Sequence, residues 1–518
     1  MRATVANAPG QVISSRTPRA RKSTKQLSLR PHPHVYEINA WAWLEKLSAR
    51  LGRLVKLADV PDTEWDAIAQ RGFDVVWLMG VWQHSAEARR IEVADHANRP
   101  LFDRVLPSWT PEDVIGSPYS IAQYVPDPRI GTWDSLDRVR KKLRARGVAL
   151  FLDFVGNHTA LDHPWTREHP EFYVQGTSED FQKEPSSFHR VETPKGPVFL
   201  AMGKDPYFPP WDDVAQLNHF SPAMRAALLA ELRAIAAHCD GVRCDMAMLQ
   251  LSDIFEKVWN HQLRGAGPPQ TEFWADAHAT VPGLILLAEA YWGTEQRLLD
   301  LGFSFVYDKD LYDDLRYVKI PELHARLAED VGYQKHLARF LENHDENRCA
   351  AVFGSERLVL AGTLMGTLPG MRFYQEGEIE GARIQLPVAL RRAAEEMPDP
   401  AGVVFFEKIL RITDERVFHE GGWNLLAVDS EGDDTSGNLV AYEWRIEDAW
   451  KLIVVNLAGA TSQGRIRFGD RPLPAEEYVF RDELDDARYA RSGDELRRLG
   501  LFVRRDGFQA HLFDVSPV

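Results

Sequence analysis

The stretch Cys239-Asp240-Gly241-Val242-Arg243-Cys244-Asp245-Met246-Ala247 has the pattern of a short buried strand whose last residues carry charged groups. An apolar helical run precedes it and a glycine opens it, as is typical of a strand that is covered on both faces. Arg243 and Asp245 are two positions apart, so both side chains point to the same side of the strand. Because buried charges need partners or water, this pair predicts either a structural ion pair or a polar cavity.

Seven other segments of the chain have the same short, apolar character and alternate with predicted helices. The segments predicted as strands are 35–39, 75–80, 148–153, 284–290, 303–308, 340–345 and 371–376, and the clearest helices are 63–72, 135–146 and 221–238. With the stretch quoted above as the fourth strand, eight strands alternate with helices. This order predicts an α/β fold in which the strands close into a (β/α)8 TIM barrel.

The rest of the chain predicts a tail, an insert and a second domain. Residues 1–30 are basic and rich in Ser and Thr, which predicts a disordered tail ahead of the barrel at 31–415. Residues 159–218 contain many prolines and aromatic residues but no clean helix, which predicts an inserted subdomain after the third strand. Residues 416–518 contain short strands between Gly and Asp turns, which predicts a C-terminal antiparallel β-sandwich.

Composition restricts the possible partners and compartment. The chain has 518 residues with 61 Lys and Arg against 76 Asp and Glu, and its net charge of −15 disfavours nucleic acid and anionic membranes as partners. No stretch is long and apolar enough to span a bilayer, and the first residues lack the apolar core of a secretory signal. The three cysteines (Cys239, Cys244, Cys349) fall in predicted barrel segments, which favours a reducing compartment. We therefore expect a cytoplasmic protein.

Polar residues gather at the predicted carboxyl ends of the strands, where barrels of this kind carry their reactive groups. They are Asp153, Asn157 and His158 after the third strand, Arg243 and Asp245 on the fourth, Glu289 on the fifth, and His344 and Asp345 on the seventh. Three converging carboxylates raise at least one pKa, so an acid and a carboxylate can coexist near neutral pH. Glycosidic cleavage needs such a pair, with one group as nucleophile and the other as proton donor.

Four stretches resemble, in order and spacing, the four signature regions of the α-amylase superfamily of glycoside hydrolases (glycoside hydrolase family 13). They are Asp153-Phe154-Val155-Gly156-Asn157-His158, Gly241-Val242-Arg243-Cys244-Asp245, Glu289 with Trp292, and Asn343-His344-Asp345. The resemblance implies that Asp245 is the nucleophile, Glu289 the general acid/base and Asp345 the transition-state stabiliser. The family mechanism is retaining, which implies carboxyl groups of Asp245 and Glu289 about 5–5.5 Å apart.

The resemblance also implies roles for the residues around this trio. His158, Arg243 and His344 would bind substrate, and Tyr119, in Ser117-Pro118-Tyr119, matches the family's stacking tyrosine. Asp153 and Asn157 would have structural roles near the site. No cofactor is expected to be required, although Asn157 could help to bind a structural calcium ion with oxygen atoms of Asp212 or Asp213.

Two departures from the family pattern limit what the resemblance implies. Many starch-cleaving members have Lys-His three and four residues after the nucleophile, whereas this chain has Met248 and Leu249. The short motif near the end of the insert is Gln216-Leu217-Asn218, which differs from the forms typical of amylases and of oligo-1,6-glucosidases. The first departure argues against a typical endo-acting α-amylase, because the Lys-His pair usually contacts the sugar on the leaving side.

The sequence predicts a retaining glycoside hydrolase that acts on α-glucosidic bonds of maltooligosaccharides or related α-glucans through a covalent intermediate on Asp245. If the loops exclude water, the same site predicts an α-glucanotransferase or a trehalose-type isomerising enzyme. A catalytically silent sugar-binding or scaffold protein on the same fold is a further alternative. The remaining alternative is a metal-dependent barrel enzyme whose metal ligands would be His158, Asp245, Glu289 and His344.

Overall fold

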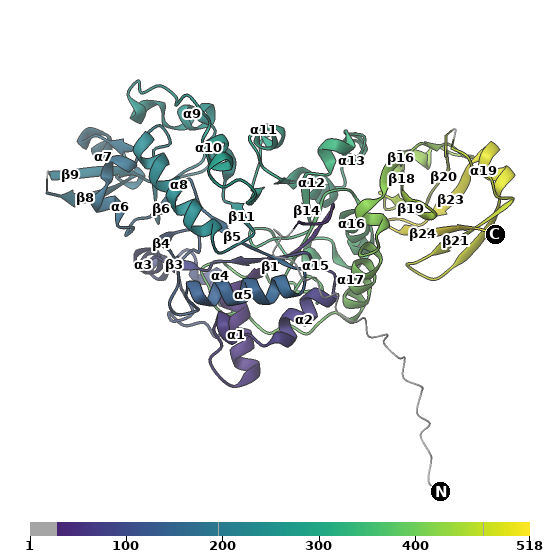
Figure 1. Ribbon diagram of the computed structural model, residues 1–518, viewed down its shortest axis with the longest axis horizontal. Coiled ribbons are helices and arrows are strands. Elements are labelled where there is room, and N and C mark those ends of the chain that lie inside the picture. The colour runs from purple at the N-terminus through teal and green to yellow at the C-terminus, as the bar shows by residue number, and fades with distance from the viewer. Residues whose placement is uncertain (1–27, 195, 470) are drawn as a thin grey trace, which may run out of the picture.

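The computed structural model describes residues 28–194, 196–469 and 471–518, which form a barrel with an elaborated face and a second domain (Figure 1). Residues 1–27 of the predicted tail lie outside the described residues. At the end of that predicted tail, Arg30 donates hydrogen bonds to Asp74, Asp414 and the carbonyl oxygen of Gly72. Arg30 is therefore fixed to the entrance of one barrel strand and to the end of the barrel's last helix.

Eight parallel strands close the barrel. Around it they follow the order β1 (His34–Asn39), β15 (Met371–Gln375), β14 (Leu337–Phe340), β13 (Phe305–Tyr307), β12 (Ile285–Ala288), β11 (Gly241–Cys244), β5 (Ala149–Phe154) and β2 (Val75–Met79). Barrel strands that follow one another along the chain lie side by side, and the pairing of β1 with β15 closes the barrel. The predicted (β/α)8 fold class is confirmed.

One strand lies earlier than its sequence pattern predicts. The seventh strand is β14, Leu337–Phe340, and the predicted segment 340–345 shares only Phe340 with it. The apolar run is interrupted by Arg339, which is buried because its guanidinium donates a 3.0 Å hydrogen bond to Asp308. Beyond the strand, the side chain of Asn343 accepts hydrogen bonds from the backbone nitrogens of Asp345 and Glu346, which turns the chain. His344 and Asp345 therefore lie on a loop above the strand end.

Helices surround the barrel. They are α1 (Ala40–Leu51), α2 (Asp62–Gln70), α5 (Trp133–Ala145), α8 (Pro222–Ala236), α9 (Ser252–Leu263), α10 (Phe273–Thr280), α11 (Glu295–Asp300), α12 (Lys309–Tyr317), α13 (Ile320–Leu327), α14 (Val331–Gln334), α15 (Cys349–Val352), α16 (Gly354–Thr367), α17 (Pro400–Thr413) and α18 (Val417–Glu420). In α5, Leu136, Val139 and Leu143 recur at helical spacing and are buried, while basic residues face outward. Gly370 joins α16 to β15 with φ of 109°, where a Cβ would collide with the carbonyl oxygen of Leu337.

Small sheets and helices project from the carboxyl ends of the second and third strands, and those after the third strand lie at the upper left of Figure 1. After β2 come β3 (Trp82–His84), α3 (Ala86–Ala94), α4 (Arg99–Val105) and β4 (Ile121–Pro126); after β5 come β6 (His158–Ala160), α6 (Trp165–Glu168), β7 (Gln175–Gly176), α7 (Ser178–Lys183), β8 (Phe188–Thr193), β9 (Gly196–Ala201) and β10 (Val214–Gln216). The sequence did not predict the sheet β7-β9-β8, because its strands are short and mostly half-buried or exposed. Phe188 of this sheet packs with Phe255 and Trp259 of α9.

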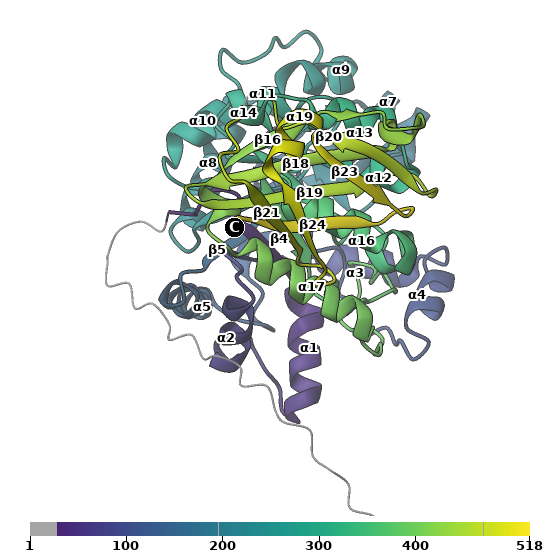
Figure 2. The same cartoon turned by 90° about the vertical axis from the view of Figure 1, so that its right-hand side faces the viewer.

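The C-terminal domain consists of two antiparallel sheets, which face the viewer in Figure 2. One has the order β16 (Gly422–Leu426), β18 (Leu439–Ile446), β19 (Ala449–Asn456), β24 (Ala510–Pro517), β21 (Glu477–Asp482) and β22 (Arg488–Ser492); the other has β17 (Val428–Asp429), β20 (Ser462–Ile466) and β23 (Leu501–Arg505), and α19 (Gly493–Leu499) follows β22. This domain is tied to the barrel by β18. Trp444 Nε1 donates to the carbonyl oxygen of Thr367 at the end of α16, and the hydroxyl groups of Tyr442 and Thr367 are 2.6 Å apart.

The thiols of all three cysteines are buried, and none forms a disulfide. Among the residues described, no helix has the length and hydropathy needed to cross a bilayer.

Replacing Arg30 with alanine should destabilise the fold. Its guanidinium lies 2.6 Å from Asp74 and 2.7 Å from Asp414, and each of the three side chains is about two-thirds buried or more. Removing Arg30 therefore takes away the positive charge that the two carboxylates share. We expect a loss of about 1 kcal/mol in the free energy of unfolding, measured by chemical denaturation. Arg90→Ala is the matched control, because Arg90 pairs with Glu87 on the exposed surface of one helix. Equal stability of Arg30→Ala and Arg90→Ala would contradict this role for Arg30.

Candidate active site

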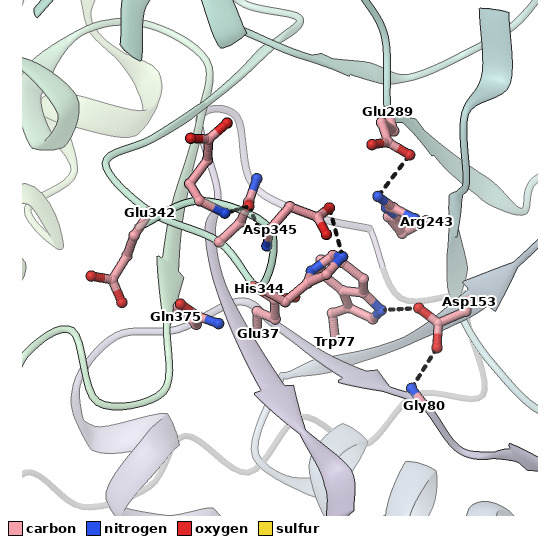
Figure 3. Close-up of polar contacts among 12 residues, drawn as sticks. Glu37, Trp77, Gly80, Asp153, Arg243, Glu289, Glu342, His344, Asp345 and Gln375 are labelled. Carbon is pink, nitrogen blue, oxygen red and sulfur yellow. Dashed lines mark hydrogen bonds and ion pairs between the residues drawn. The ribbon is translucent and has the colours of Figure 1, made fainter. Parts of the chain in front are cut away.

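The guanidinium of Arg243, on β11, lies beside the carboxyl group of Glu289 (Figure 3). Nη1 donates a 2.7 Å hydrogen bond to Asp245, and Nη2 lies 2.8 Å from Oε2 of Glu289. The rings of Trp77, Tyr119 and Tyr307 surround it, with its Cζ between 5.1 and 5.7 Å from each centroid. A fully buried cation is therefore stabilised by two carboxylates and three aromatic rings.

Asp245 and Glu289 come together because pairing between their strands continues beyond the strand ends. Glu289 N donates to Cys244 O at 3.0 Å, and Ala247 N donates to Glu289 O at 3.1 Å. Between these bonds, Met246 adopts a left-handed conformation with φ of 44° and ψ of 46°, an unfavourable one for a side chain of this type. This conformation lets Met246 N donate a 2.7 Å hydrogen bond to Oε2 of Glu289. The backbone after one carboxylate thus holds the other.

The carboxyl group of Glu289 is buried and fully engaged. Arg243 and Met246 N contact Oε2, while the hydroxyl group of Tyr291 donates a 2.7 Å hydrogen bond to Oε1. Burial raises the pKa of Glu289, the charge of Arg243 lowers it, and the charges of Asp245 and Asp345 raise it further, so the net shift is upward. A carboxyl group with a raised pKa can carry a proton at a pH where ordinary glutamates are ionised.

Burial also raises the pKa of Asp245, although Arg243 opposes the shift through its charge and its hydrogen bond. The charge of Asp345 adds to the upward shift. Asp245 and Glu289 contact the same guanidinium, and the charge of Asp245 raises the pKa of Glu289, which favours one protonated and one ionised group. Such a pair can supply an acid and a nucleophile at the same pH.

Asp345 and His344 form the other side of the site. The side chain of Asp345 is 50% exposed, in contrast to the buried carboxyl groups of Asp245 and Glu289. Desolvation acts to raise the pKa of Asp345, but the charge and hydrogen bond of His344 outweigh it and hold the pKa below its ordinary value. Nε2 of His344 lies 3.0 Å from Oδ2 of Asp345 and 2.7 Å from the hydroxyl oxygen of Tyr119. The accessible acid of the trio is therefore ionised.

Asp153 lies below this group and is fully buried. Trp77 Nε1 donates to Oδ1 at 2.9 Å, and Gly80 N donates to Oδ2 at 2.7 Å (Figure 3). Burial raises the pKa of Asp153 to about 6, against the lowering effects of these hydrogen bonds and of the charges of Arg243 and His344. Both of its oxygens are thus used to hold the chain at the end of β2.

His158 and Asn157 lie beside the site at the beginning of β6. Burial lowers the pKa of His158 to about 4, while a hydrogen bond with the backbone of Tyr119 and the charge of Glu289 act in the opposite direction. The ring of His158 packs 5.3 Å from that of Trp211. His158 is therefore a neutral imidazole next to Tyr119, the position in which the sequence predicted a substrate contact.

The side chain of Asn157, where the sequence suggests calcium, is hydrogen-bonded to Gln216. Gln216 Nε2 donates to Oδ1 of Asn157 at 3.0 Å, and Nδ2 of Asn157 returns a 3.3 Å hydrogen bond to Gln216, so the two amides satisfy each other. In the part of the chain that the structure describes, no group of three or more His, Cys, Asp or Glu side chains is arranged to hold a metal ion. The four ligands suggested for a metal-dependent enzyme therefore do not form a metal site.

Two residues of the site were not predicted from the sequence. Tyr291 donates to Glu289, and Glu37 of β1 bonds to Nδ1 of His344 at a distance of 2.5 Å. Glu37 is the one acidic residue of an otherwise apolar strand (Val35-Tyr36-Glu37-Ile38), the same signal that drew attention to Arg243. Tyr291 gives no such signal, because a tyrosine a few residues beyond the end of a strand is common in protein cores.

Comparisons with known proteins relate this chain to α-amylases. A family model described as alpha amylase, catalytic domain, matches residues 64–299. Alpha-amylase 3 of Dictyoglomus thermophilum is 24% identical over 298 residues, which are 51% of this chain and 54% of that protein. An alpha-1,4-glucan:maltose-1-phosphate maltosyltransferase of Cereibacter sphaeroides is 33% identical over 93 residues, 16% of this chain and 14% of that protein. The chain thus spans about half, or less, of the length of these two curated relatives.

Solved structures share the fold over nearly the whole chain. The noncanonic maltogenic alpha-amylase AmyB of Thermotoga neapolitana superimposes with a TM-score of 0.67, covering 94% of this chain and 99% of that one at 18% identity. An alpha-amylase of Lactobacillus plantarum gives a TM-score of 0.64 at 20% identity, with 93% and 98% of the two chains covered. At this level of identity, the likeness shows the fold.

Asp153→Asn should change how stability depends on pH. Because burial raises the pKa of Asp153 from 3.8 to about 6, the folded state keeps a proton between these values that the unfolded state releases. The contribution of Asp153 to the free energy of unfolding is therefore fully present below pH 3.8 and decreases by up to about 3 kcal/mol as pH rises through 6. Asparagine does not titrate, so the wild type should lose stability relative to the variant across this window.

Chemical denaturation at several pH values across this window measures the difference between the two proteins. Asp300→Asn, at the exposed end of α11, is the control and should stay parallel to the wild type. A difference between Asp153→Asn and wild type that does not vary with pH would show that Asp153 does not bind this proton.

Proposed function

Because the chain belongs to the α-amylase superfamily, we propose that it is a retaining glycoside hydrolase of α-glucosidic bonds in maltooligosaccharides or related α-glucans. The observation that carries the proposal is the pair Asp245 and Glu289, buried side by side on one guanidinium at the carboxyl ends of β11 and β12. The raised pKa of Glu289 suits an acid, and the guanidinium of Arg243, which opposes the upward pKa shift of Asp245, suits a nucleophile at that position.

The reaction follows from the state of each group. Glu289 donates its proton to the glycosidic oxygen while the carboxylate of Asp245 attacks the anomeric carbon, so the bond to the leaving sugar breaks as a bond to Asp245 forms. Glu289 then takes a proton from water, whose oxygen displaces Asp245 and restores the original anomeric configuration. Arg243 favours the ionised form of Asp245 through its charge and its hydrogen bond, and the ionised Asp345 and its neighbour His344 are placed to hold sugar hydroxyl groups.

An exposed aromatic pair beside Glu289 supports an oligosaccharide as substrate. Trp292, three residues after Glu289, is 41% exposed, and its ring lies 5.1 Å from that of Tyr207, which is 65% exposed. Trp292 is held with φ of 66°, a conformation rare for a large side chain. Asp205 accepts a hydrogen bond from the backbone nitrogen of Tyr207, which fixes the loop. We assign this pair to sugar rings on the leaving-group side of the site.

Transfer to a sugar instead of water is the second candidate function. The match to a maltosyltransferase supports it, as does the position of the aromatic pair, which could hold an acceptor sugar after the first product leaves. We propose hydrolysis first. A neutral sugar is compatible with the net charge of −15, and the free, buried thiols agree with a cytoplasmic location.

Asp245→Asn and Glu289→Gln should each lower turnover of maltooligosaccharides by about 10³-fold or more, because each removes one of the two reacting groups. Both substitutions keep the shape of the side chain, so circular dichroism and thermal unfolding should show an intact fold. Asp300→Asn on α11 is the control and should retain wild-type turnover. Wild-type turnover in both site variants would refute the assignment.

The same assay distinguishes the two candidate functions. Products from maltooligosaccharides are followed by proton NMR, in which shorter chains that appear first as α-anomers indicate retaining hydrolysis. Longer chains or new linkages would indicate transfer.

Trp292→Ala should weaken activity on long substrates more than on maltose. Loss of one stacking face costs about 1 kcal/mol, so kcat/KM for maltoheptaose should fall about fivefold relative to maltose. Met397→Ala, at a residue that is 91% exposed on the loop before α17, is the control and should not change this ratio. An unchanged ratio in Trp292→Ala would remove the aromatic pair from the substrate site.

A further inference from the structure

Glu37 places a carboxylate inside the barrel where the surrounding strand is apolar. It lies on β1 between Trp77 of β2 and Gln375 of β15 and is completely buried. Its Oε1 is 2.5 Å from Nδ1 of His344, whereas its Oε2 is buried without a hydrogen-bond partner. A half-satisfied buried carboxylate is costly, so stability alone does not explain an acid at this position.

The contacts of His344 determine its protonation. A carboxylate only accepts hydrogen bonds, so Nδ1 carries a proton toward Glu37. On the other side of the ring, Nε2 lies 3.0 Å from the carboxylate of Asp345 and 2.7 Å from the hydroxyl oxygen of Tyr119. With a carboxylate facing each nitrogen, the ring is held as an imidazolium that donates from both sides.

We propose that Glu37 is a positioning residue, whose buried carboxylate orients the ring of His344 and keeps Nε2 a proton donor toward Asp345 and a sugar hydroxyl group. Figure 3 shows Glu37 beneath His344, with Asp345 on the opposite side of the ring. The part that concerns the sugar rests on the proposed function, whereas the state of the ring does not. Burial lowers the pKa of His344, but the charges and hydrogen bonds of Asp345 and Glu37 raise it to about 10.

The other groups that face His344 do not replace Glu37. Asp345 is on its own loop and half exposed to water, which screens its charge. The ring of Tyr119 stacks on that of His344 at a centroid distance of 5.2 Å, and the ring of Trp77 meets it edge-on at 5.5 Å. Phenol and indole groups are neutral, so neither supplies a charge. Asp153 and Asp245 have pKa values that His344 lowers, but their hydrogen bonds go to Trp77, Gly80 and Arg243. Glu37 is thus the buried charge in direct contact with the ring.

The first test is a titration of His344 in Glu37→Gln. Glutamine keeps the length of the side chain and can still accept from Nδ1, but it removes the charge. The imidazole ¹⁵N signals of His344, assigned by their absence in His344→Gln, should titrate at least one pH unit below the wild-type value of about 10. An unchanged titration would overturn the proposal. This readout needs no substrate, so it decides the inference even if the protein does not cleave α-glucans.

Two further variants separate the effect from a loss of packing. Glu342→Gln removes another buried carboxylate near the same end of the barrel, but Glu342 bonds to Arg348 and to Cys349 N rather than to His344. This control should leave the titration of His344 within a few tenths of a unit of wild type. If Glu37→Gln does not fold, Glu37→Asp serves in its place, because the shorter side chain weakens contact with Nδ1 and should also lower the pKa of His344.

The second test is the pH dependence of kcat/KM. At about pH 5.5 the ring is protonated in wild type and Glu37→Gln alike, so the variant should lose little. At about pH 9.5 most rings of the variant have lost the proton that most wild-type rings still carry, so the loss should be about threefold larger or more. A loss of the same size at both pH values would mean that Glu37 acts by packing alone and would overturn the proposal. Inactive wild-type protein would refute the proposed function and leave the titration result intact.

Discussion

The contact of Arg243 with Asp245 and Glu289 determines how the rest of the site is built. A guanidinium without exposure to water needs negative charge beside it, and two carboxylates at the ends of adjacent strands supply it. The same cation lowers the cost of burying two acids, whose pKa values burial raises. The left-handed turn at Met246 and the aromatic rings around Arg243 follow from this need, because both keep the three groups together without solvent.

The barrel was predictable because its strands are buried on both sides and therefore show as continuous apolar runs. Prediction failed where a charged residue is buried with a specific partner. Arg339, which is paired with Asp308, interrupts the apolar run of β14, so the seventh strand was predicted at 340–345 instead of Leu337–Phe340. It also missed the small sheet that contains Phe188, since strands of a few half-exposed residues have no clear periodicity. Local pattern thus locates elements whose burial is uniform and misses those whose burial depends on distant partners.

The candidate site could be predicted to a similar extent. The sequence placed Asp245, Glu289 and Asp345 near one another, because carboxyl ends of parallel strands meet at one face of a barrel. It did not show that Asp345 is exposed while the other two are buried, nor that Glu37 lies under His344, because both facts depend on side-chain packing across the barrel. The hydrogen-bonded amide pair of Asn157 and Gln216 depends on the fold of the insert in the same way.

The link between Trp444 and Thr367 affects how the two domains can be separated. Thr367 ends α16, and three residues later Gly370 begins the turn into β15, which closes the barrel against β1. The C-terminal domain therefore braces the final closing step of the barrel. A gene truncated after residue 415 would encode a barrel whose seam lacks this brace, so the barrel is not an interchangeable module that recombination could move without its neighbour.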